Sequence, residues 1–470
     1  MAFIKAKLGL GLHDSDSGES EPKSTQQQEN TATTTAIDPK QWSNSVRKRA
    51  LCCLGLFAVL EPFSSSMIAP ALQLIAAEFH ITSSVKRNLV LSSFVLPYAF
   101  GSLLVAPVSE SVGRRPVLLA SAVFFLAFTI ACGFAQTSAQ LIVFRVLSGF
   151  GGCVPLAIGA AVVGDLYGPH ERGSAMAVYS GLQVAGPALG PIVGGWIAQS
   201  INSWRWTFYV CAMASAVVTT IGLVYLPETY APKLNRQHKQ PLSHCFHSLD
   251  RPFILLATQP IIQVLAAYAA IVFGVYYILL TTIVGVFETN YGQSTGIASL
   301  HYLALLLGFM VSVVGGGKAM DALYRRMTKD GQGPSPEARI PFLAASGTLL
   351  PAGLLLYGWT AQYRVFWFAP DIGLFLIGLG ISAPRAAIQH YILDCYSSLG
   401  FAASALAAMN VARFLAGFGF PLFADVMFDA LGLGWGSSLL ALAAAVTGCL
   451  AVSLWKFGPQ LRGMSSFADA

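Results

Sequence analysis

Two ionisable residues lie inside long apolar segments, where a buried charge is costly and usually serves a function. Glu61 lies twelve positions after Arg49. On a helix this spacing places it about 18 Å into an apolar membrane core of roughly 30 Å. Pro62 and a run of serines follow, so a helix break beside a cavity is expected. Arg145 lies in another apolar segment.

Proton transfer is the chemistry that these two residues could perform. A carboxyl group in a cavity gains or loses its proton as hydration and nearby charges change, and a fixed guanidinium influences when it does so. We therefore predict that Glu61 and Arg145 take part in proton coupling. The alternative is structural: Glu61 would be the static partner of a buried arginine, and Arg145 would bond backbone carbonyls.

Other polar residues in the apolar segments could line a cavity for an organic substrate, because such sites are mostly apolar with a few polar groups. The candidates are Gln183, Tyr268, Arg385, Asn410 and Arg413. The arginines could instead brace an interface within the chain. Aromatic residues are also common in belts that face lipid, so Tyr268 is the one aromatic side chain included among them.

Composition identifies the class of protein. Of the 470 residues, 55% are hydrophobic and 11% are charged, whereas soluble domains carry about 25% charged residues. Apolar segments of membrane length recur, which predicts an all-α polytopic membrane protein in a lipid bilayer. The net charge of +6 lies largely in loops and calls for no nucleic-acid partner. The eight cysteines form no C-x-x-C pair, and we expect no cofactor and no metal site.

The elements that must position these residues are twelve predicted transmembrane helices. They cover residues 50–76, 88–108, 116–135, 139–164, 172–198, 205–226, 259–284, 295–318, 340–358, 365–390, 399–424 and 436–457. The predicted domains are a disordered cytosolic tail (1–46), an N-terminal six-helix repeat (47–226), a cytosolic central loop (227–256), a C-terminal six-helix repeat (257–458) and a cytosolic C-terminal tail (459–470).

The basic residues predict the orientation. Of the 28 lysines and arginines, 21 fall in inner segments if both termini are inside, four in outer loops and three within spans. Because an excess of basic residues marks the cytosolic side, we expect both termini in the cytosol.

Five residues around the fourth span recur 229 positions later, around the tenth. They are Gly149, Gly151, Pro155, Asp165 and Tyr167, and their counterparts are Gly378, Gly380, Pro384, Asp394 and Tyr396. Two parallel repeats of six helices are a transporter architecture, with the substrate site at their interface near the membrane midplane.

Short loops after the second and eighth spans share a second pattern. The first loop holds Glu110, Gly113, Arg114 and Arg115, and the second holds Asp321, Arg325 and Arg326. Any short cytosolic loop carries basic residues. The recurrence nevertheless indicates a conformational latch, in which the acidic side chain pairs with arginines or with a helix N-terminus.

The fifth span contains a run rich in glycine and proline. Its marked positions are Gly186, Gly190, Pro191, Gly194 and Gly195. A membrane tolerates such a run because neighbouring helices satisfy the freed backbone groups. Glycines four apart also let helix backbones approach closely.

These stretches together resemble one family. Gly113–Arg115 is similar to the end of the loop motif of the major facilitator superfamily, from which Ala106 and Ser111 depart. Residues 141–149 resemble its fourth-helix motif, and residues 186–195 match the fifth-helix motif of its drug:proton antiporters. The form of the loop is similar to that of the fungal branch.

The resemblance implies the major facilitator fold, with twelve transmembrane helices in two six-helix repeats. It also implies a secondary active transporter that exports small organic compounds, such as drugs, toxins or secondary metabolites, by proton antiport. Its partners would be an organic substrate, protons and the lipid bilayer. A monomer in the plasma membrane is expected, and the family's fourth-helix arginine, implicated in proton coupling, corresponds to Arg145.

Other functions remain alternatives. A proton-coupled importer of a small organic solute, or a non-transporting membrane sensor, would use the same fold. The antiporter motif disfavours import, and the polar tail and central loop are short for a signalling protein. An enzyme is not expected, because His244 and His247 form the only close histidine pair. A nucleotide-driven pump is disfavoured too, because Gly315–Ala319 lacks the serine or threonine of a phosphate-binding loop.

Overall fold

The computed structural model describes residues 38–234, 250–329, 336–396, 401–463 and 465. Every secondary-structure element in these ranges is a helix. Much of the predicted N-terminal tail and parts of the predicted central loop and C-terminal tail lie outside the described residues.

The described elements follow the predicted order of spans. Those before the central loop are η1 (Pro39–Gln41), α2 (Asn44–Met67), η2 (Ala69–Ala71), α3 (Leu72–Glu78), α4 (Ser84–Ser92), α5 (Leu96–Val112), α6 (Arg114–Gly133), α7 (Ser138–Leu166), α8 (Pro169–Ile201), α9 (Arg205–Tyr225) and α10 (Ala231–Leu234). Those after it are α12 (Asp250–Thr258), α13 (Pro260–Tyr291), α14 (Thr295–Leu300), α15 (Tyr302–Val311), the π-helical turn η3 (Ser312–Gly316), α16 (Gly317–Lys329), η4 (Pro336–Arg339), α17 (Ile340–Gly347), α18 (Leu349–Gln362), α19 (Phe368–Tyr396) and α20 (Ala402–Gly463).

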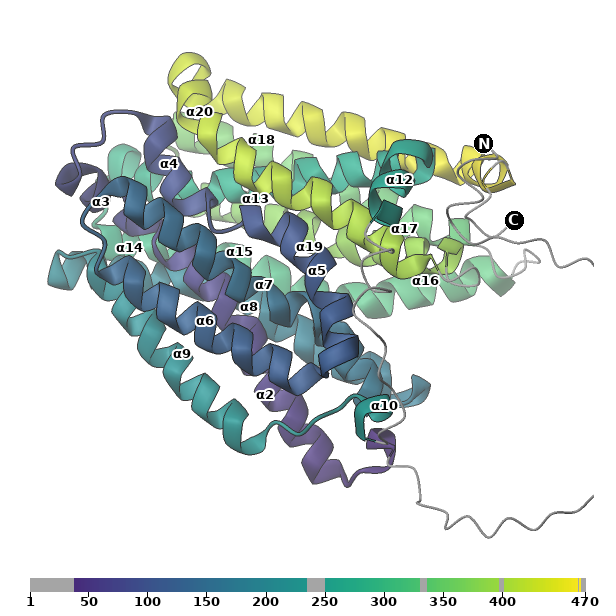
Figure 1. Ribbon diagram of the computed structural model, residues 1–470. Coiled ribbons are helices and arrows are strands. Elements are labelled where there is room, and N and C mark those ends of the chain that lie inside the picture. The colour runs from purple at the N-terminus through teal and green to yellow at the C-terminus, as the bar shows by residue number, and fades with distance from the viewer. Residues whose placement is uncertain (1–37, 235–249, 330–335, 397–400, 464, 466–470) are drawn as a thin grey trace, which may run out of the picture. The chain divides into compact units, whose positions relative to one another are not determined.

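Eleven of the described helical segments are long and apolar enough to cross a membrane. The last of them, α20, has 62 residues. That is about 93 Å of helix against an apolar core of roughly 30 Å. Its backbone breaks at Gly432 (φ 76°, ψ 168°), a conformation open to glycine alone, and the chain folds back there (Figure 1). Because α20 therefore crosses twice, the chain makes the twelve crossings that the sequence predicts.

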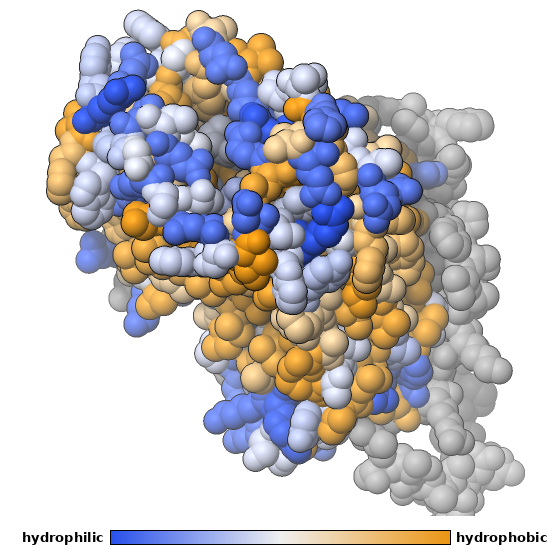
Figure 2. All heavy atoms as spheres, turned by 90° about the vertical axis from the view of Figure 1, so that its left-hand side faces the viewer, coloured by the Kyte–Doolittle hydropathy of each residue, from blue (hydrophilic) through white to orange (hydrophobic). Residues whose placement is uncertain are grey.

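The surface suits a lipid environment. Large apolar side chains lie exposed on the helices, among them Val217 (59% exposed), Leu307 (59%) and Val314 (67%). Hydrophilic residues gather on the end of the bundle that faces the viewer in Figure 2, and hydrophobic residues cover much of its sides. These long apolar helices and their apolar surface make this a multi-pass membrane protein. Helices suit a bilayer because they satisfy their own backbone groups where lipid offers no partners.

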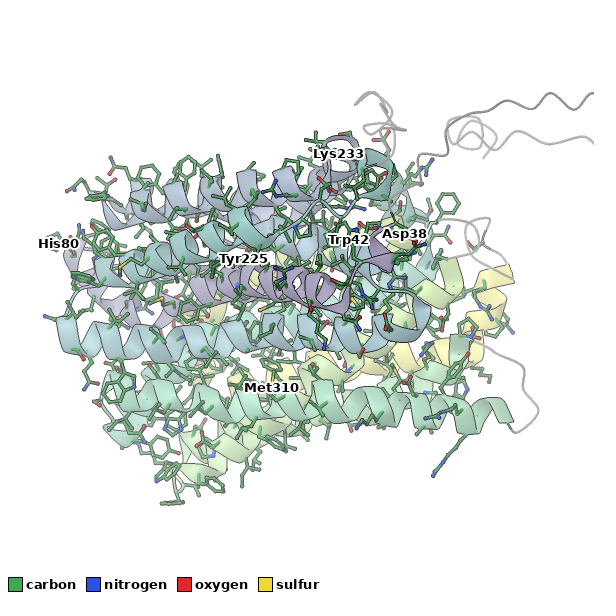
Figure 3. All side chains as sticks on the ribbon, turned by 90° about the horizontal axis from the view of Figure 1, so that it is seen from below. Asp38, Trp42, His80, Tyr225, Lys233 and Met310 are labelled. Carbon is green, nitrogen blue, oxygen red and sulfur yellow. The ribbon has the colours of Figure 1, made fainter. Side chains whose placement is uncertain are left out.

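The two ends of the bundle can be told apart by its first and last helices. α2 begins and α20 finishes at one end, which we call the terminal end. The turn between α3 and α4 and the fold-back of α20 lie at the other, which we call the distal end (Figure 1). Figure 3 shows His80 at one extreme of the bundle and Asp38 and Lys233 toward the other.

The first two crossings are interrupted helices. α2 continues through Pro62, so the break that the sequence predicts beside Glu61 is displaced. It comes at Ile68, where Pro70 offers no N–H and the chain passes through η2. The second crossing divides between α4 and α5, just before Pro97.

The recurring glycines have the same role in both halves. A Cβ atom at Gly149 would collide with the carbonyl oxygen of Phe94, and one at Gly378 with that of Leu305. The fourth crossing thus packs on the second as the tenth packs on the eighth. In each case the glycine permits a close approach between two backbones, which supports the internal repeat.

Bonds between the two halves of the chain gather toward the distal end. Asp425 in α20 accepts hydrogen bonds from Arg87 (2.8 Å) and Asn88 (2.7 Å) in α4. Near the same end, the backbone N–H of Gly296 in α14 donates to the Gln199 side chain in α8 (2.7 Å). These bonds hold α4 and α8 of the first half against α20 and α14 of the second.

Candidate functional site in the cavity between the halves

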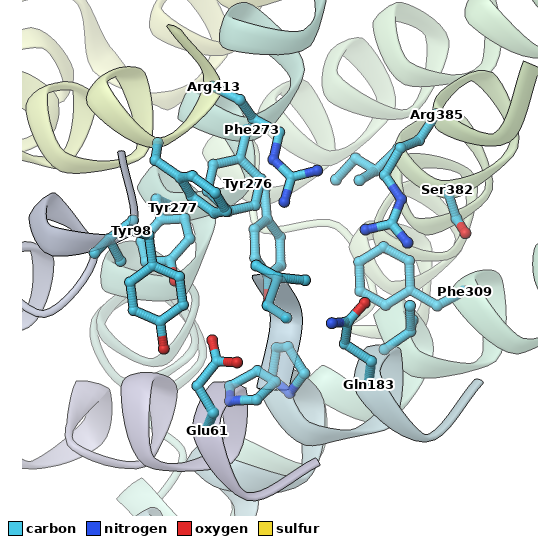
Figure 4. Close-up of a pocket in the computed structure, with 17 residues that line it drawn as sticks. Glu61, Tyr98, Gln183, Phe273, Tyr276, Tyr277, Phe309, Ser382, Arg385 and Arg413 are labelled. Carbon is cyan, nitrogen blue, oxygen red and sulfur yellow. The ribbon is translucent and has the colours of Figure 1, made fainter. Parts of the chain in front are cut away.

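A cavity of about 100 Å³ lies between the halves, within the bundle (Figure 4). Its walls come from α2, α5, α7 and α8 on one side and from α13, α15, α19 and α20 on the other. The repeat predicts a site at this interface. The cavity is smaller than the roughly 300–1,000 Å³ of typical ligand pockets, so a drug-sized molecule requires the halves to part.

Charged and polar side chains face one another across this cavity. Glu61 and Gln183 stand on the N-terminal half, and Arg385 and Arg413 on the C-terminal half, with their polar ends directed into the space between (Figure 4). Glu61 is 7% exposed, Gln183 9% and Arg413 8%. The sequence predicts these four as site residues, and the structure brings them together.

Several buried polar atoms here have no hydrogen-bond partner in the described part of the chain. They are Oε2 of Glu61, Nε2 of Gln183, the hydroxyl oxygens of Tyr98 and Tyr276, and Nε of Arg413. Most buried polar atoms are paired, because an unpaired one costs about 1–3 kcal/mol. Unpaired donors and acceptors around one cavity indicate a place for a bound molecule.

Aromatic rings form much of the remaining wall. The guanidinium carbon of Arg413 lies 4.6 Å from the ring centres of both Phe273 and Phe414, within cation–π range. Tyr98 packs on Phe414 from the other half, with 5.3 Å between ring centres. Sequence reasoning missed these aromatic residues, because the same residue types line lipid-facing belts and only the fold shows which of them face the cavity.

Arg145 lies outside the cavity and is 1% exposed. Its guanidinium donates to the carbonyls of Ser64 (3.2 Å), Ser65 (3.1 Å), Val90 (3.3 Å) and Leu91 (3.3 Å). These residues form the last turns of α2 and α4, where carbonyls run out of helical donors. A cation is also favourable at the negative end of a helix dipole.

Arg145 therefore braces α2 about one turn from Glu61. The structure records no ion pair between the two among the described residues, and the guanidinium groups that face the Glu61 carboxyl are those of Arg385 and Arg413 (Figure 4). This is the geometry of the structural alternative for Arg145.

The glycine run of α8 packs against α2, the helix that carries Glu61. Cβ atoms at Gly186, Gly190 and Gly194 would collide with backbone carbonyl oxygens of α2. Pro191 lies within the same stretch of α8 and removes one backbone donor.

The last residue of the run faces the other half of the molecule. A Cβ at Gly195 would collide with the side chain of Ser299 in α14. The run therefore fits α8 closely to α2 and, toward the distal end, to the C-terminal half.

Arg114 is the centre of a bonded cluster in the first loop motif. Its backbone N–H donates to Glu228 (2.9 Å) and its Nε to Asp165 (3.3 Å). Glu110 lies 3.8 Å from the same guanidinium and is half-exposed. Gly113 makes the turn with φ 109°, a conformation that favours glycine.

Arg115 joins the same part of the molecule by donating to the carbonyl of Leu223 (2.8 Å). Apart from Glu228, which follows α9 directly, the partners named for both arginines belong to the first half. In this conformation the loop fastens α5, α6, α7 and the end of α9 to one another at the terminal end.

The second loop motif is arranged differently. Asp321, Arg325 and Arg326 lie exposed on α16, and Arg325 donates to the backbone carbonyl of Asp321 (3.2 Å). The acidic residue at the end of α19, Asp394, is bonded instead by Arg339 of η4, at 2.5 Å. By the spacing of the repeat, Arg325 is the counterpart of Arg114 and would be expected to bond Asp394. In the structure a different segment, η4, makes this contact.

Comparison with known proteins places the chain in a family. Residues 54–421 match the model of the Major Facilitator Superfamily. The chain belongs to this superfamily. Efflux pump vrtL of Penicillium aethiopicum is 37% identical over 461 residues, which cover 92% of this chain and 89% of that protein. Efflux pump radE of Floropilus chiversii is 36% identical over 454 residues, covering 92% and 84%.

Solved structures of the Major Facilitator Superfamily share the fold. The xylose transporter XylE from E. coli, in a partially occluded inward open conformation, matches with a TM-score of 0.65 at 16% identity. The match covers 87% of this chain and 99% of that one. At this identity the likeness concerns the fold alone.

Two predicted cavity residues of this superfamily member do not line the cavity. Tyr268 is 1% exposed and lies beside Gly347 and Gly448, in the packing of α13, α17 and α20. Asn410 lies on α20, one turn before Arg413, and is absent from the lining. Both residues stand on helices that reach the cavity, but they lie on other faces of those helices than the residues that line it.

Proposed function

We propose that this superfamily member is a secondary active exporter of small organic compounds, driven by protons that move the opposite way. The observation that carries the proposal is the cavity between the halves, in which the Glu61 carboxyl faces Arg385 and Arg413. The relatives named efflux pumps, at 36% and 37% identity, support the outward direction.

The proposed coupling rests on competition at Glu61. An ionised carboxylate accepts hydrogen bonds from a substrate, and a protonated carboxyl loses much of that capacity. Proton and substrate then each weaken the binding of the other, so substrate binding favours release of the proton and low pH weakens substrate binding without abolishing it. Arg145 would contribute by holding α2, and thereby Glu61, in position.

The proposed orientation places the terminal end in the cytosol and the protein in the plasma membrane. The bias of basic residues supports it. The bonds of Asp425 and Gln199 would then close the cavity toward the outside, as in an inward-facing carrier. One chain holds the whole cavity, so a monomer suffices for transport.

Transport in proteoliposomes with an imposed proton gradient tests the proposal. Glu61→Gln mimics the protonated carboxyl, and we expect it to lose uphill export of a panel of organic compounds. Exchange of the same compounds across the membrane should persist, because exchange needs no proton. Glu78→Gln, which alters a carboxyl outside the cavity, is the control and should export as the unaltered protein does.

Two results would count against this function. Uphill export by Glu61→Gln at the unaltered rate would remove the carboxyl from coupling. Accumulation in the direction of proton flow, with substrate affinity that rises at low pH, would indicate a proton-coupled importer instead.

A further inference from the structure

We infer that the cavity selects hydroxylated aromatic acids, with a hydroxyl group at one end of a flat ring facing Glu61 and a carboxylate at the other end facing Arg385 and Arg413. The inference rests on the proposed function, since it names the substrate class of the same cavity. It concerns binding alone and can be tested without any gradient.

The N-terminal side of the cavity calls for a hydrogen-bond donor. The Glu61 carboxyl is 7% exposed and lies beside the Tyr98 hydroxyl (Figure 4), yet its Oε2 has no hydrogen-bond partner in the described chain. An ionised carboxylate only accepts hydrogen bonds. A hydroxyl group is the simplest neutral donor that satisfies it, and this contact uses the ionised form that the coupling proposal assigns to the substrate-bound state.

The C-terminal side calls for an acceptor, and preferably an anion. Arg413 is 8% exposed and its Nε is unpaired, while Arg385 directs its guanidinium into the same space (Figure 4). The ion pairs recorded for the described residues include neither arginine. A guanidinium group only donates, and a carboxylate is the group that matches its two-pronged geometry.

The charges of the residues that line the cavity also favour an anionic ligand. Glu61, Arg385 and Arg413 are the charged residues among those that line the cavity in the described structure. Two cations against one carboxylate leave one positive charge without a counter-ion in a water-poor space. A monoanion neutralises it, whereas an organic cation adds to it, and uncompensated charge is costly in such surroundings.

The walls between the two polar sides suit a flat ring. Phe273 and Phe414 already stack on the Arg413 guanidinium. Tyr98 and Phe309 face the cavity from opposite sides in Figure 4. Offset or edge-on contacts with such rings favour an aromatic body over a branched aliphatic one.

Three small probes with matched rings test the inference on the purified full-length protein in nanodiscs, by calorimetry at neutral pH. They are para-hydroxycinnamate, para-methoxycinnamate, which lacks the donor, and tyramine, which replaces the anion by a cation. We expect para-hydroxycinnamate to bind about tenfold or more tightly than either of the others, as for hydrogen bonds to charged groups.

Variants test which side chains bind each end of the probe. Glu61→Gln should abolish the preference for the hydroxyl over the methoxy compound and keep the preference for the acid over tyramine. Arg413→Gln and Arg385→Gln should abolish the preference for the acid over tyramine and keep the preference for the hydroxyl over the methoxy compound. Arg205→Gln, which removes a positive charge outside the cavity, should change neither preference. Unchanged thermal melting of each variant shows that it is folded.

Some results would overturn the inference. They are failure of para-hydroxycinnamate to bind, equal affinity for the three probes, or binding of tyramine that Arg413→Gln leaves unchanged. The proposed export function fails separately, if probes bind in the expected order but are not moved by a proton gradient.

Discussion

Arg145 shows how one side chain holds two helix ends in the membrane. Its guanidinium bonds carbonyls in the last turns of α2 and of α4. A lysine at this place would keep the charge but could not span both ends, because its ammonium is a single point of donation. Removing the guanidinium would leave these carbonyls facing an apolar interior.

At the residue scale, we expect Arg145→Ala to destabilise the protein by about 3 kcal/mol or more, because several buried acceptors lose their donor at once. Arg145→Lys should recover part of the loss. Thermal melting in detergent measures both. Arg205→Ala, at an ion pair in which Glu78 is 42% exposed, is the control and should melt close to the unaltered protein. Unchanged melting of Arg145→Ala would argue against the bracing role.

The residues of the cavity show what the sequence can and cannot predict. Glu61, Arg385 and Arg413 were predictable because a charge inside an apolar span is rare and needs a reason. Tyr276 was not, because an aromatic residue in such a span also suits lipid. Tyr268 shares helix α13 with Tyr276, and only the packing of that helix separates the two.

At the scale of elements, the contact of α8 with α2 depends on glycine. The Cβ of Gly194→Ala would collide with the carbonyl oxygen of Met67, which belongs to the backbone and cannot move aside easily. We expect Gly194→Ala to destabilise the protein by about 1–3 kcal/mol, as overpacking does, and to slow transport by displacing Glu61. Melting and transport rate measure these effects.

Gly181→Ala is the matched control, because Gly181 lies on the same helix and a Cβ there meets nothing within 4 Å. It should be neutral, or stabilising by up to about 1 kcal/mol, since alanine favours the helix. Equal effects of the two substitutions would mean that helix propensity, and not the contact with α2, explains the effect of replacing Gly194.

Most helices could be predicted from apolar length, and the interruptions within them could not. The break in α2 falls at Ile68 and not beside Pro62, because one missing N–H is tolerated within a membrane helix. The partner of Asp394 was equally beyond the sequence, since Arg339 reaches it from another segment. Long-range contacts of this kind depend on the assembled fold.

At the scale of the whole molecule, the bonds of Asp425 join the halves at the distal end, where Arg87 and Asp425 are 23% and 21% exposed. They must break if the cavity is to open on that side. We expect Asp425→Asn to favour the distal-open state and so to raise, several-fold, the rate at which an impermeant maleimide labels Ser382→Cys in the cavity of a cysteine-free protein.

Glu78→Gln is the control for this experiment, because Glu78 pairs with Arg205 within one half near the same end (2.6 Å). It should leave the labelling rate unchanged. The expectation fails if both substitutions accelerate labelling equally, since the effect would then be a general loosening of the distal end.

Labelling of intact cells tests the proposed orientation. Gln136 is exposed at the distal end and Ser174 at the terminal end. In a cysteine-free background, Gln136→Cys should react with an impermeant maleimide added outside, and Ser174→Cys should react only after the cells are made permeable. The opposite pattern would reverse the orientation.

The guanidinium of Arg145 also sets an order of events during synthesis. The first two spans leave the ribosome before the fourth, and each is interrupted near carbonyls that Arg145 bonds in the folded protein. Until α7 is inserted, these carbonyls lack the guanidinium, and water, headgroups or the translocon suit them better than lipid, which offers no donor. The N-terminal half therefore cannot complete its assembly span by span: its earliest helices wait for a later one to bring the side chain that closes them.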